Sequence, residues 1–253
     1  MVNRGDVSPP HIRPMDASKP LGGKVALITG ASRGIGFAIA RTLGRMGAKL
    51  SICARDAKKL ESAAGELERQ GAAVFAFPAD VTCQNDVTAL IEKTSRTLGP
   101  IEILVNNAGV GYFGPTHLAG EADWDQVLDT NLKSVFLLSR AVAPGMIGLG
   151  RGDIINIASL AGKNAFAGGG IYCASKWGLL GLTACMAEDL RPFGVRVSAI
   201  CPGTVATEFS PHAGKDPRKM LQAEDIAHAV EVIVTQAPQS FISEILLRPT
   251  QKP

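Results

Sequence analysis

The stretch YCASKWG places a tyrosine and a lysine four positions apart, at Tyr172 and Lys176. In a helix, side chains at positions i and i+4 project from the same face. A lysine ammonium close to a phenol favours the phenolate, which lowers the phenol pKa from about 10 toward the range of proton exchange near neutral pH. Taken alone, however, the pair favours a more ordinary explanation, a solvated helix face. Its meaning depends on the rest of the chain.

A second candidate site is the glycine-rich segment TGASRGIG at 29–36, which follows the apolar run KVALIT. Its glycines, Gly30, Gly34 and Gly36, have the spacing G-x-x-x-G-x-G rather than the stricter G-x-G-x-x-G. Glycines permit a tight turn and a close backbone approach, and the amino terminus of the helix that follows offers free N–H groups to phosphate. Its position after the first expected strand favours a dinucleotide site over a ligand-free turn.

The end of the second expected strand distinguishes between dinucleotides. NAD-binding loops usually carry Asp or Glu there, which accepts hydrogen bonds from the ribose hydroxyls. This chain has Cys53, Ala54 and then Arg55. A neutral pocket flanked by Arg55 and Arg33 would bind a 2′-phosphate through charge-assisted hydrogen bonds. The sequence therefore predicts NADP(H) in preference to NAD(H).

Strand-like and helix-like segments alternate along the chain and must position these residues. Short apolar runs predict strands at 24–29, 49–54, 73–77, 101–106, 153–158, 195–200 and 241–247. Helix-forming segments predict helices at 34–46, 56–70, 85–98, within 123–148, within 170–191 and at 223–236. Such alternation predicts an α/β fold, a single Rossmann-type doubly wound domain with a seven-stranded parallel sheet and helices on both faces.

The expected domain boundaries are simple. No linker-like stretch or internal repeat interrupts 21–250, so residues 21–253 are expected to form one domain. Residues 1–20 lack the apolar core of a signal peptide and are expected to form a flexible tail. Residues at about 203–222 are expected to form a loop with at most one short helix.

Composition narrows the classes of function. A net charge of +3 without a Lys/Arg run argues against nucleic-acid binding. No uninterrupted apolar run approaches the roughly 18 residues of a membrane helix, so no membrane association is expected. The cysteines are odd in number and lack metal-ligand spacing, so we expect no metal site and a reducing, cytoplasmic location. All five are expected to be small apolar fillers: Cys53, Cys83, Cys173, Cys185 and Cys201.

Seven short motifs together resemble the short-chain dehydrogenase/reductase family over residues 21–250. They follow the family's order and spacing: TGASRGIG at 29–36, ADV at 79–81, NNAG at 106–109, TNLKSVF at 130–136, INIASLAG at 155–162, YCASK at 172–176 and PGTVAT at 202–207. Ser159 precedes Tyr172 by thirteen residues, the gap typical of that family. The resemblance reverses the interpretation of the tyrosine–lysine pair as a surface face.

The resemblance implies a catalytic tetrad and a set of cofactor contacts at the matching positions. The tetrad would be Asn131, Ser159, Tyr172 and Lys176. The implied contacts to NADP(H) are Gly30, Ser32, Arg33, Gly34, Ile35, Gly36, Arg55, Asp80, Val81, Asn107, Ala108, Gly109, Tyr172, Lys176, Pro202, Gly203, Val205 and Thr207. Among these, Asp80 and Val81 would lie beside the adenine, and residues 107–109 beneath the nicotinamide ribose.

The implied reaction is hydride transfer between NADP(H) and a carbonyl or secondary alcohol. NADPH would supply the hydride and the protein the proton. Tyr172 would act as general acid in reduction and as base in oxidation, with its pKa lowered by Lys176. Ser159 would orient the substrate oxygen, Lys176 would also bind the nicotinamide ribose, and Asn131 would hold a water in a proton relay.

The substrate is less constrained than the reaction. About a dozen residues separate PGTVATEF from the next expected helix, so the site is expected to be open. The ending SEILLRPT resembles reductases of 3-hydroxy acids and small carbonyl compounds, whereas 3-oxoacyl-carrier-protein reductases commonly end in a DGG-type motif; both classes stay open. The histidines are expected to be surface or packing residues, with His117 and His212 nearest the substrate region.

Two further expectations come with the resemblance. By analogy with the family, the helices within 123–148 and 170–191 are expected to pair across two-fold axes in a homodimer or homotetramer. The alternative function is an NADP(H)-binding regulatory or scaffolding protein of weak activity on the same fold. Such a protein would have no need of a complete tetrad.

Overall fold

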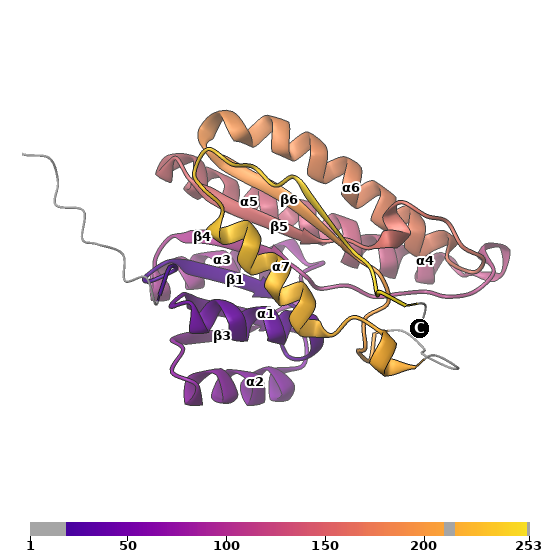
Figure 1. The fold of residues 1–253 in the computed structure, drawn as a ribbon, viewed down its shortest axis with the longest axis horizontal. Helices are drawn as coiled ribbons and strands as arrows, with labels where there is room; N and C mark the ends of the chain where they lie inside the picture. Colours follow the sequence, from indigo (N-terminus) through magenta and orange to yellow (C-terminus); the bar gives the residue numbers. More distant parts are fainter. Residues whose placement is uncertain (1–18, 210–215, 252–253) are drawn as a thin grey trace, which may run out of the picture.

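A computed structural model describes residues 19–209 and 216–251 of the chain. The expected tail at 1–20 therefore lies almost wholly outside the described residues, as do His212 and the middle of the expected loop at 203–222. In the described part, seven strands form one parallel sheet with helices on both faces, as predicted from the sequence (Figure 1).

The sheet has the strand order of a doubly wound fold. Its strands are β1 (Val25–Thr29), β2 (Lys49–Ala54), β3 (Val74–Pro78), β4 (Ile101–Asn106), β5 (Gly152–Ile157), β6 (Val195–Pro202) and β7 (Glu244–Leu247). They lie in the order β3-β2-β1-β4-β5-β6-β7, and each neighbouring pair is parallel. The order reverses between β1 and β4, which opens a crevice at the carboxyl ends of these strands, where such sheets bind ligands.

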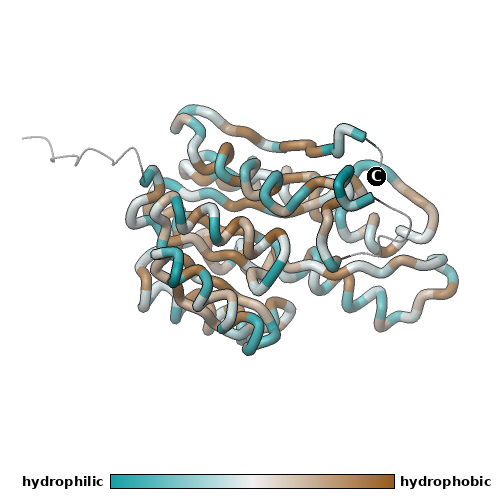
Figure 2. Tube along the Cα trace, turned by 60° about the horizontal axis from the view of Figure 1, so that its bottom comes forward, coloured by the Kyte–Doolittle hydropathy of each residue, from teal (hydrophilic) through white to brown (hydrophobic). Residues whose placement is uncertain are grey.

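Two apolar clusters hold the helices against the sheet. On one face lie α1 (Gly34–Arg45), α2 (Ala57–Arg69) and α7 (Ala223–Thr235), packed through residues such as Ile39, Leu60 and Ile226. On the other face lie α3 (Gln84–Leu98), α5 (Ser134–Leu149) and α6 (Gly170–Leu190), packed through residues such as Leu90, Leu138 and Ala187. Hydrophilic residues recur at intervals along the outer helices, as amphipathic packing requires (Figure 2).

The long helix expected within 123–148 is divided by a π-helical turn. It consists of α4 (Glu121–Leu128), the π-helix η2 (Asp129–Lys133) and α5. Such π-helical turns insert a residue into the helical ladder and often occur at functional sites. Here the turn contains Asn131, which is 1% exposed.

The same helical run, 121–149, is the one among the described residues that is long and apolar enough to cross a membrane, with a hydropathy of 1.3. Its α5 part packs against β4 and β5 and against the neighbouring helices α3 and α6. This packing accounts for the buried part of the run, which is 39% of its apolar window.

The prediction that all five cysteines are buried fillers is wrong for two of them. Cys53, Cys173 and Cys201 are buried, but Cys83 and Cys185 are exposed. Cys83 occupies the N-cap of α3, and helix ends lie at the surface of the sheet layers. Cys185 lies on an exposed face of α6.

Candidate active site

One cleft of about 1470 Å³ runs along the carboxyl ends of the strands. Ordinary small-molecule pockets measure roughly 300–1,000 Å³, so this cleft has room for a dinucleotide and a second molecule. Eighteen of the predicted site residues line it: Gly30, Ser32, Arg33, Gly34, Ile35, Arg55, Asp80, Val81, Asn107, Ala108, Gly109, Ser159, Tyr172, Lys176, Pro202, Gly203, Val205 and Thr207. The two exceptions, Gly36 and Asn131, lie behind the lining.

The glycine loop between β1 and α1 needs glycine for two different reasons. Gly30 and Gly34 have φ of 63° and 57°, a region that other residues rarely adopt. Gly36 is needed for close packing instead, because a Cβ there would lie 2.4 Å from the Gly30 carbonyl oxygen and 2.5 Å from Asn107 Nδ2. Gly36 therefore shapes the loop and does not line the cleft, so its predicted contact with the cofactor stays a prediction.

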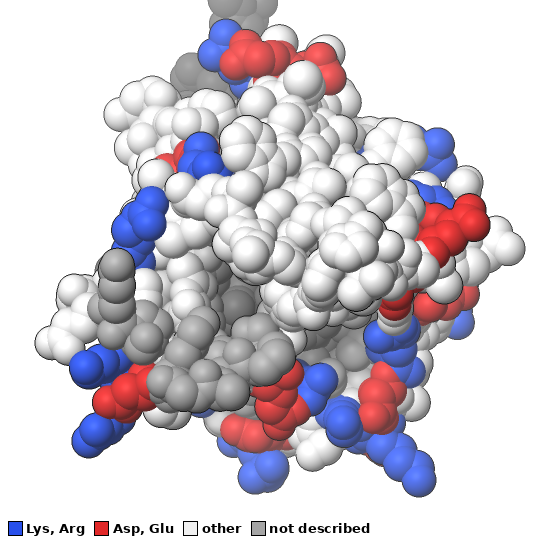
Figure 3. All heavy atoms as spheres, turned by 90° about the vertical axis from the view of Figure 1, so that its right-hand side faces the viewer, with Lys and Arg blue, Asp and Glu red and all other residues white. Residues whose placement is uncertain are grey.

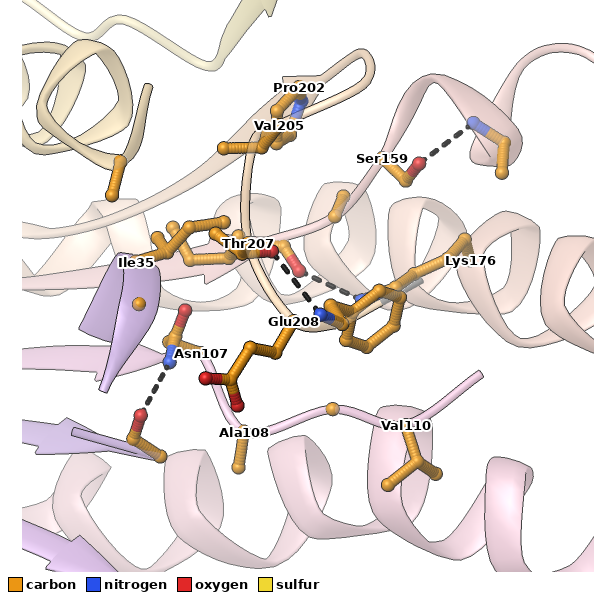
Figure 4. Close-up of a pocket in the computed structure, with 18 of the residues that line it drawn as sticks. Ile35, Asn107, Ala108, Val110, Ser159, Lys176, Pro202, Val205, Thr207 and Glu208 are labelled. Carbon is orange, nitrogen blue, oxygen red and sulfur yellow. Dashed lines mark hydrogen bonds between the residues drawn. The ribbon is translucent and has the colours of Figure 1, made fainter. Parts of the chain in front are cut away.

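Thr29 and Asn107 fasten the glycine loop to the end of β4. The Thr29 hydroxyl accepts hydrogen bonds from the N–H groups of Asn107 and Ala108, both at 3.0 Å. Asn107 Nδ2 donates in return to the carbonyl oxygens of Thr29 and Gly30, at 2.9 and 3.2 Å (Figure 4). Thr29 was missed in the sequence; its only signal was a polar residue at the end of a buried strand.

The end of the cleft at β2 and β3 has the charges expected of a 2′-phosphate site. Ala54 ends β2, so no carboxylate stands at the position typical of NAD binding. Arg55 lines the cleft, and so does Lys59, a cation that sequence reasoning missed. Burial alone would raise the pKa of Asp80, but hydrogen bonds from Thr82 and the charge of Arg55 hold it below its usual value. Asp80 is therefore an ionised acceptor at neutral pH.

Tyr172 forms part of the cleft wall from the first turn of α6. Its side chain is 8% exposed, and burial raises the pKa of its phenol to about 12, although a hydrogen bond with Ser159 lowers it. The prediction of a lowered phenol pKa is wrong for the ligand-free protein, in which the net shift is upward. The cost of removing a phenolate from water exceeds the stabilisation that the surrounding groups offer.

Lys176 is bound through its Nζ to the end of β5 and lies near the ring of Tyr172. Its Nζ donates a 2.9 Å hydrogen bond to the Ile157 carbonyl oxygen and lies 5.8 Å from the centroid of the Tyr172 ring. Burial lowers the pKa of Lys176 to about 8, because the ammonium loses its hydration. The lysine therefore carries a positive charge at neutral pH but can lose its proton just above it.

Ser159 stands two residues beyond the end of β5, on the same side of the cleft as Tyr172. Its hydroxyl accepts a 3.0 Å hydrogen bond from the N–H of Ala161 and also pairs with the Tyr172 hydroxyl (Figure 4 shows the Ala161 bond). The serine hydroxyl is thus oriented before any substrate arrives. Ser159 follows the carboxyl end of β5, and Tyr172 lies in the first turn of α6, the next α-helix along the chain. Both therefore lie at the edge of the sheet where the parallel strands end.

Asn131 is connected to the site through other residues. Its Oδ1 accepts from the Val110 N–H at 2.9 Å, and its Nδ2 donates to the Val110 carbonyl oxygen at 2.8 Å and to Ser175 Oγ at 3.0 Å. Ser175 in turn donates to the Tyr172 carbonyl oxygen at 2.7 Å. Asn131 therefore positions the Val110 segment and the first turn of α6, with Ser175 as a link that the sequence did not reveal.

The chain is similar to known proteins over most of its length. Residues 24–218 match the family model described as short chain dehydrogenase. The chain is 41% identical over 212 residues to 2-(S)-hydroxypropyl-CoM dehydrogenase 3 of Xanthobacter autotrophicus, covering 83% of each. It is 33% identical, over 99% of its length, to glycine betaine reductase ATRR of Emericella nidulans, but spans only 21% of that larger protein.

A solved structure has the same fold along nearly the whole chain. It is a metagenomic short-chain oxidoreductase in complex with NADP, with a TM-score of 0.82 and 45% identity, covering 92% of this chain and 99% of that one. The match of the family model extends over more than half of the sequence. The chain therefore belongs to the short-chain dehydrogenase family.

Proposed function

We propose that the protein is an NADP(H)-dependent oxidoreductase that reduces a ketone or oxidises the corresponding secondary alcohol. The observation that carries the proposal is that Tyr172, Ser159 and Lys176 border the same cleft as the glycine loop. A proton donor, an orienting hydroxyl and a cation thus lie at one end of a cleft whose other end suits phosphate.

The cleft fits NADP(H) by its charges and by its backbone. Gly30 and Gly34 leave the loop backbone free of side chains next to the amino terminus of α1, where N–H groups and the helix dipole favour phosphate. Arg33, Arg55 and Lys59 supply cations along the lining. The solved relative in complex with NADP supports the same choice. When bound, NADPH supplies the hydride.

The proposed proton donor is the phenol of Tyr172. With a pKa of about 12, this phenol is protonated at neutral pH and can protonate a substrate oxygen as negative charge develops on it. Ser159 donates a second hydrogen bond to the same oxygen and fixes its position. The buried ammonium of Lys176, 5.8 Å from the centroid of the ring, stabilises the phenolate that remains.

Replacement of Tyr172 by phenylalanine tests this proposal. Tyr172→Phe keeps the ring and removes the proton donor, so we expect carbonyl-dependent NADPH oxidation to fall about 10²- to 10⁴-fold while NADPH still binds. The matched control is Tyr112→Phe, since Tyr112 is the other tyrosine and does not line the cleft. Tight NADPH binding without turnover on any carbonyl would instead support a regulatory protein.

We also propose that the chain assembles as a homodimer or homotetramer through the outer faces of α4, α5 and α6. Three large apolar side chains stand exposed there: Trp124, Phe136 and Trp177 are 46%, 44% and 54% exposed. Aromatic residues of this kind are enriched in the centres of protein–protein interfaces. Closed two-fold symmetry would cover the same face on both copies.

A further inference from the structure

Two phenylalanine rings contact the ring of Tyr172 in the cleft, and a third stacks on one of them. The centroid of the Phe113 ring lies 5.5 Å from the centroid of the Tyr172 ring. The centroid of the Phe209 ring lies 5.8 Å from the same point. Phe166 stacks on Phe113 at 6.4 Å with an interplanar angle of 28°. All three rings line the cleft. The exposed fractions are 40% for Phe113, 42% for Phe209 and 48% for Phe166. We call these three residues the aromatic wall.

Glycines make room for two of these rings. A Cβ on Gly111 would lie 2.6 Å from the Phe113 ring, and a Cβ on Gly169 would lie 2.5 Å from the Phe166 ring. The two loops are also joined, since the Gly114 N–H donates a 2.9 Å hydrogen bond to the Gly168 carbonyl oxygen. A side chain at Gly111 or Gly169 would therefore occupy the space that the Phe113 or Phe166 ring fills.

Most charges of the cleft lie away from the aromatic wall; the exceptions are Lys176, Arg248 and Glu208, which precedes Phe209 and pairs with Arg33. Most of the charged lining residues belong to the expected cofactor end: Arg33, Arg55, Asp56, Lys59 and Asp80. Lys163, three residues before Phe166, is paired with Glu244 at 3.0 Å. The end of the molecule that faces the viewer in Figure 3 has a broad uncharged upper part, with Lys, Arg, Asp and Glu gathered mainly around and below it.

We infer that the aromatic wall binds an uncharged aryl group, or an apolar group of similar size, attached next to the reacting carbonyl. The inference rests on the proposed function, because two rings of the wall contact the proposed proton donor. Half-exposed rings gain by covering their apolar faces, and stacked or tilted aromatic pairs add to that gain. The substrate class is therefore uncharged aryl ketones and the matching alcohols. This choice disfavours the 3-hydroxy acids that the chain ending suggested, because their carboxylate needs a cation.

The competing explanation is a carboxylate substrate held by Arg248. Apart from Lys176, this exposed arginine is the one cation in the described lining that lies outside the expected cofactor end. The two substrate classes differ in a single measurable way. A negative charge on the substrate should lower its turnover if the aromatic wall selects it, and raise it if Arg248 does.

Three related substrates separate these possibilities. Ethyl benzoylacetate carries an aryl group and no charge, ethyl acetoacetate replaces the aryl group by methyl, and benzoylacetate restores the aryl group with a free carboxylate. We expect kcat/KM with NADPH to be at least about tenfold higher for ethyl benzoylacetate than for either of the others. Equal turnover of ethyl acetoacetate would overturn the inference. So would faster turnover of benzoylacetate that is lost in Arg248→Gln.

Substitutions in the aromatic wall test the same inference from the protein side. Phe113→Leu and Phe166→Leu should each raise KM for ethyl benzoylacetate about five- to tenfold. The KM for ethyl acetoacetate and the Kd for NADPH should stay unchanged. Phe193→Leu is the matched control, since Phe193 is 49% exposed but does not line the cleft. Equal KM values for ethyl benzoylacetate in all three variants and the wild type would contradict the inference.

A binding measurement keeps this inference distinct from the proposed function. Ethyl 3-phenylpropionate has the phenyl group and the ethyl ester of ethyl benzoylacetate but no ketone. Its binding to the NADP-loaded protein therefore does not depend on turnover. Calorimetry should show binding to the wild type and to Phe193→Leu, and binding at least about fivefold weaker to Phe166→Leu. Such binding without reduction of any ketone would reject the proposed function and retain the wall. Reduction of ketones without aryl preference would reject the wall alone.

Discussion

Arg33 and Glu208 form an ion pair between the glycine loop and the segment that follows β6. Arg33 is the residue before α1, on one side of the cleft, and Glu208 lies on the other. Figure 4 shows the Glu208 side chain extending from the Thr207 segment toward Asn107 and Ala108. In the ligand-free protein, a carboxylate thus engages an arginine that is expected to bind phosphate.

Removal of this carboxylate should favour the cofactor. In Glu208→Gln, NADPH no longer competes with an internal anion for Arg33, so its Kd should fall roughly two- to fivefold, as expected for an exposed ion pair. The gain should shrink as salt screens the charges. Fluorescence titration at two salt concentrations measures both effects. Glu231→Gln, at a half-buried glutamate on α7 that pairs with His228 and does not line the cleft, should leave the Kd unchanged. An unchanged Kd in Glu208→Gln would exclude the competition.

Cofactor preference should follow the charges at the end of β2. Ala54→Asp combined with Arg55→Gln introduces a carboxylate and removes a cation where the 2′-phosphate is expected. The Kd for NADPH should rise about tenfold or more, while the Kd for NADH should stay equal or fall. Lys58→Gln, an exposed lysine outside the lining, serves as the control. Retained preference for NADPH in the double variant would contradict the assignment of the 2′-phosphate to the end of β2.

Two glycine-to-alanine changes should have opposite effects on the free energy of unfolding. Gly36→Ala forces a Cβ against the Gly30 carbonyl and Asn107, so we expect a loss of about 1–3 kcal/mol and weaker NADPH binding. Gly65→Ala lies within α2 in open space and should gain about 0.5–1 kcal/mol. Urea unfolding of both variants measures the contrast. Equal stabilities would mean that the loop repacks around Gly36 at little cost.

Lys176 should make the stability of the protein depend on pH. Burial lowers its pKa from 10.5 to about 8, so between these values the unfolded state binds more protons than the folded state. Stability from this group therefore rises as the pH increases from about 8 toward 10.5, by roughly 3 kcal/mol in total. Lys176→Met has no titrating group at this position. The unfolding free energy of the wild type should therefore increase relative to that of the variant from pH 8 to pH 10.5.

Urea unfolding of both proteins at pH 7, 8.5 and 10 gives the comparison. The other titratable groups are shared, which includes Tyr172, whose raised pKa acts in the opposite direction only above about pH 10. Below pH 8 the variant should be at least as stable as the wild type, although it loses activity. A constant difference at all three pH values would mean that Lys176 is not desolvated in the folded protein.

The oligomer should depend on the exposed aromatic face of the helices. Trp177→Glu puts a charge at the centre of the proposed interface, and so we expect light scattering to show a lower mass than for the wild type. Phe193→Glu, an equally exposed aromatic residue in the 3₁₀ turn after α6, should keep the wild-type mass. A wild-type protein that is already monomeric would exclude assembly through this face.

Most elements could be predicted because they depend on local signals. Asp56 caps α2 by accepting the Lys59 N–H at 3.1 Å, and Gly71 has the positive φ of a helix stop. The last strand was predicted from 241 but begins at Glu244. Before that residue, Ile242 bonds to side chains instead, with its N–H donating to Gln236 and its carbonyl accepting from Ser198. No local sequence pattern shows where the backbone changes from hydrogen bonds with side chains to hydrogen bonds with the neighbouring strand.

The sequence by itself determined the order of the elements, the glycine loop and the positions of Ser159, Tyr172 and Lys176, since periodicity, turn chemistry and motif spacing are properties of neighbouring residues. Only the tertiary structure decided how these groups behave. The pKa values of Tyr172 and Lys176 depend on burial, which sums over atoms from many segments. The aromatic wall likewise exists because folding brings Phe113 and Phe209 to the Tyr172 ring and Phe166 to Phe113, although these residues are distant along the chain.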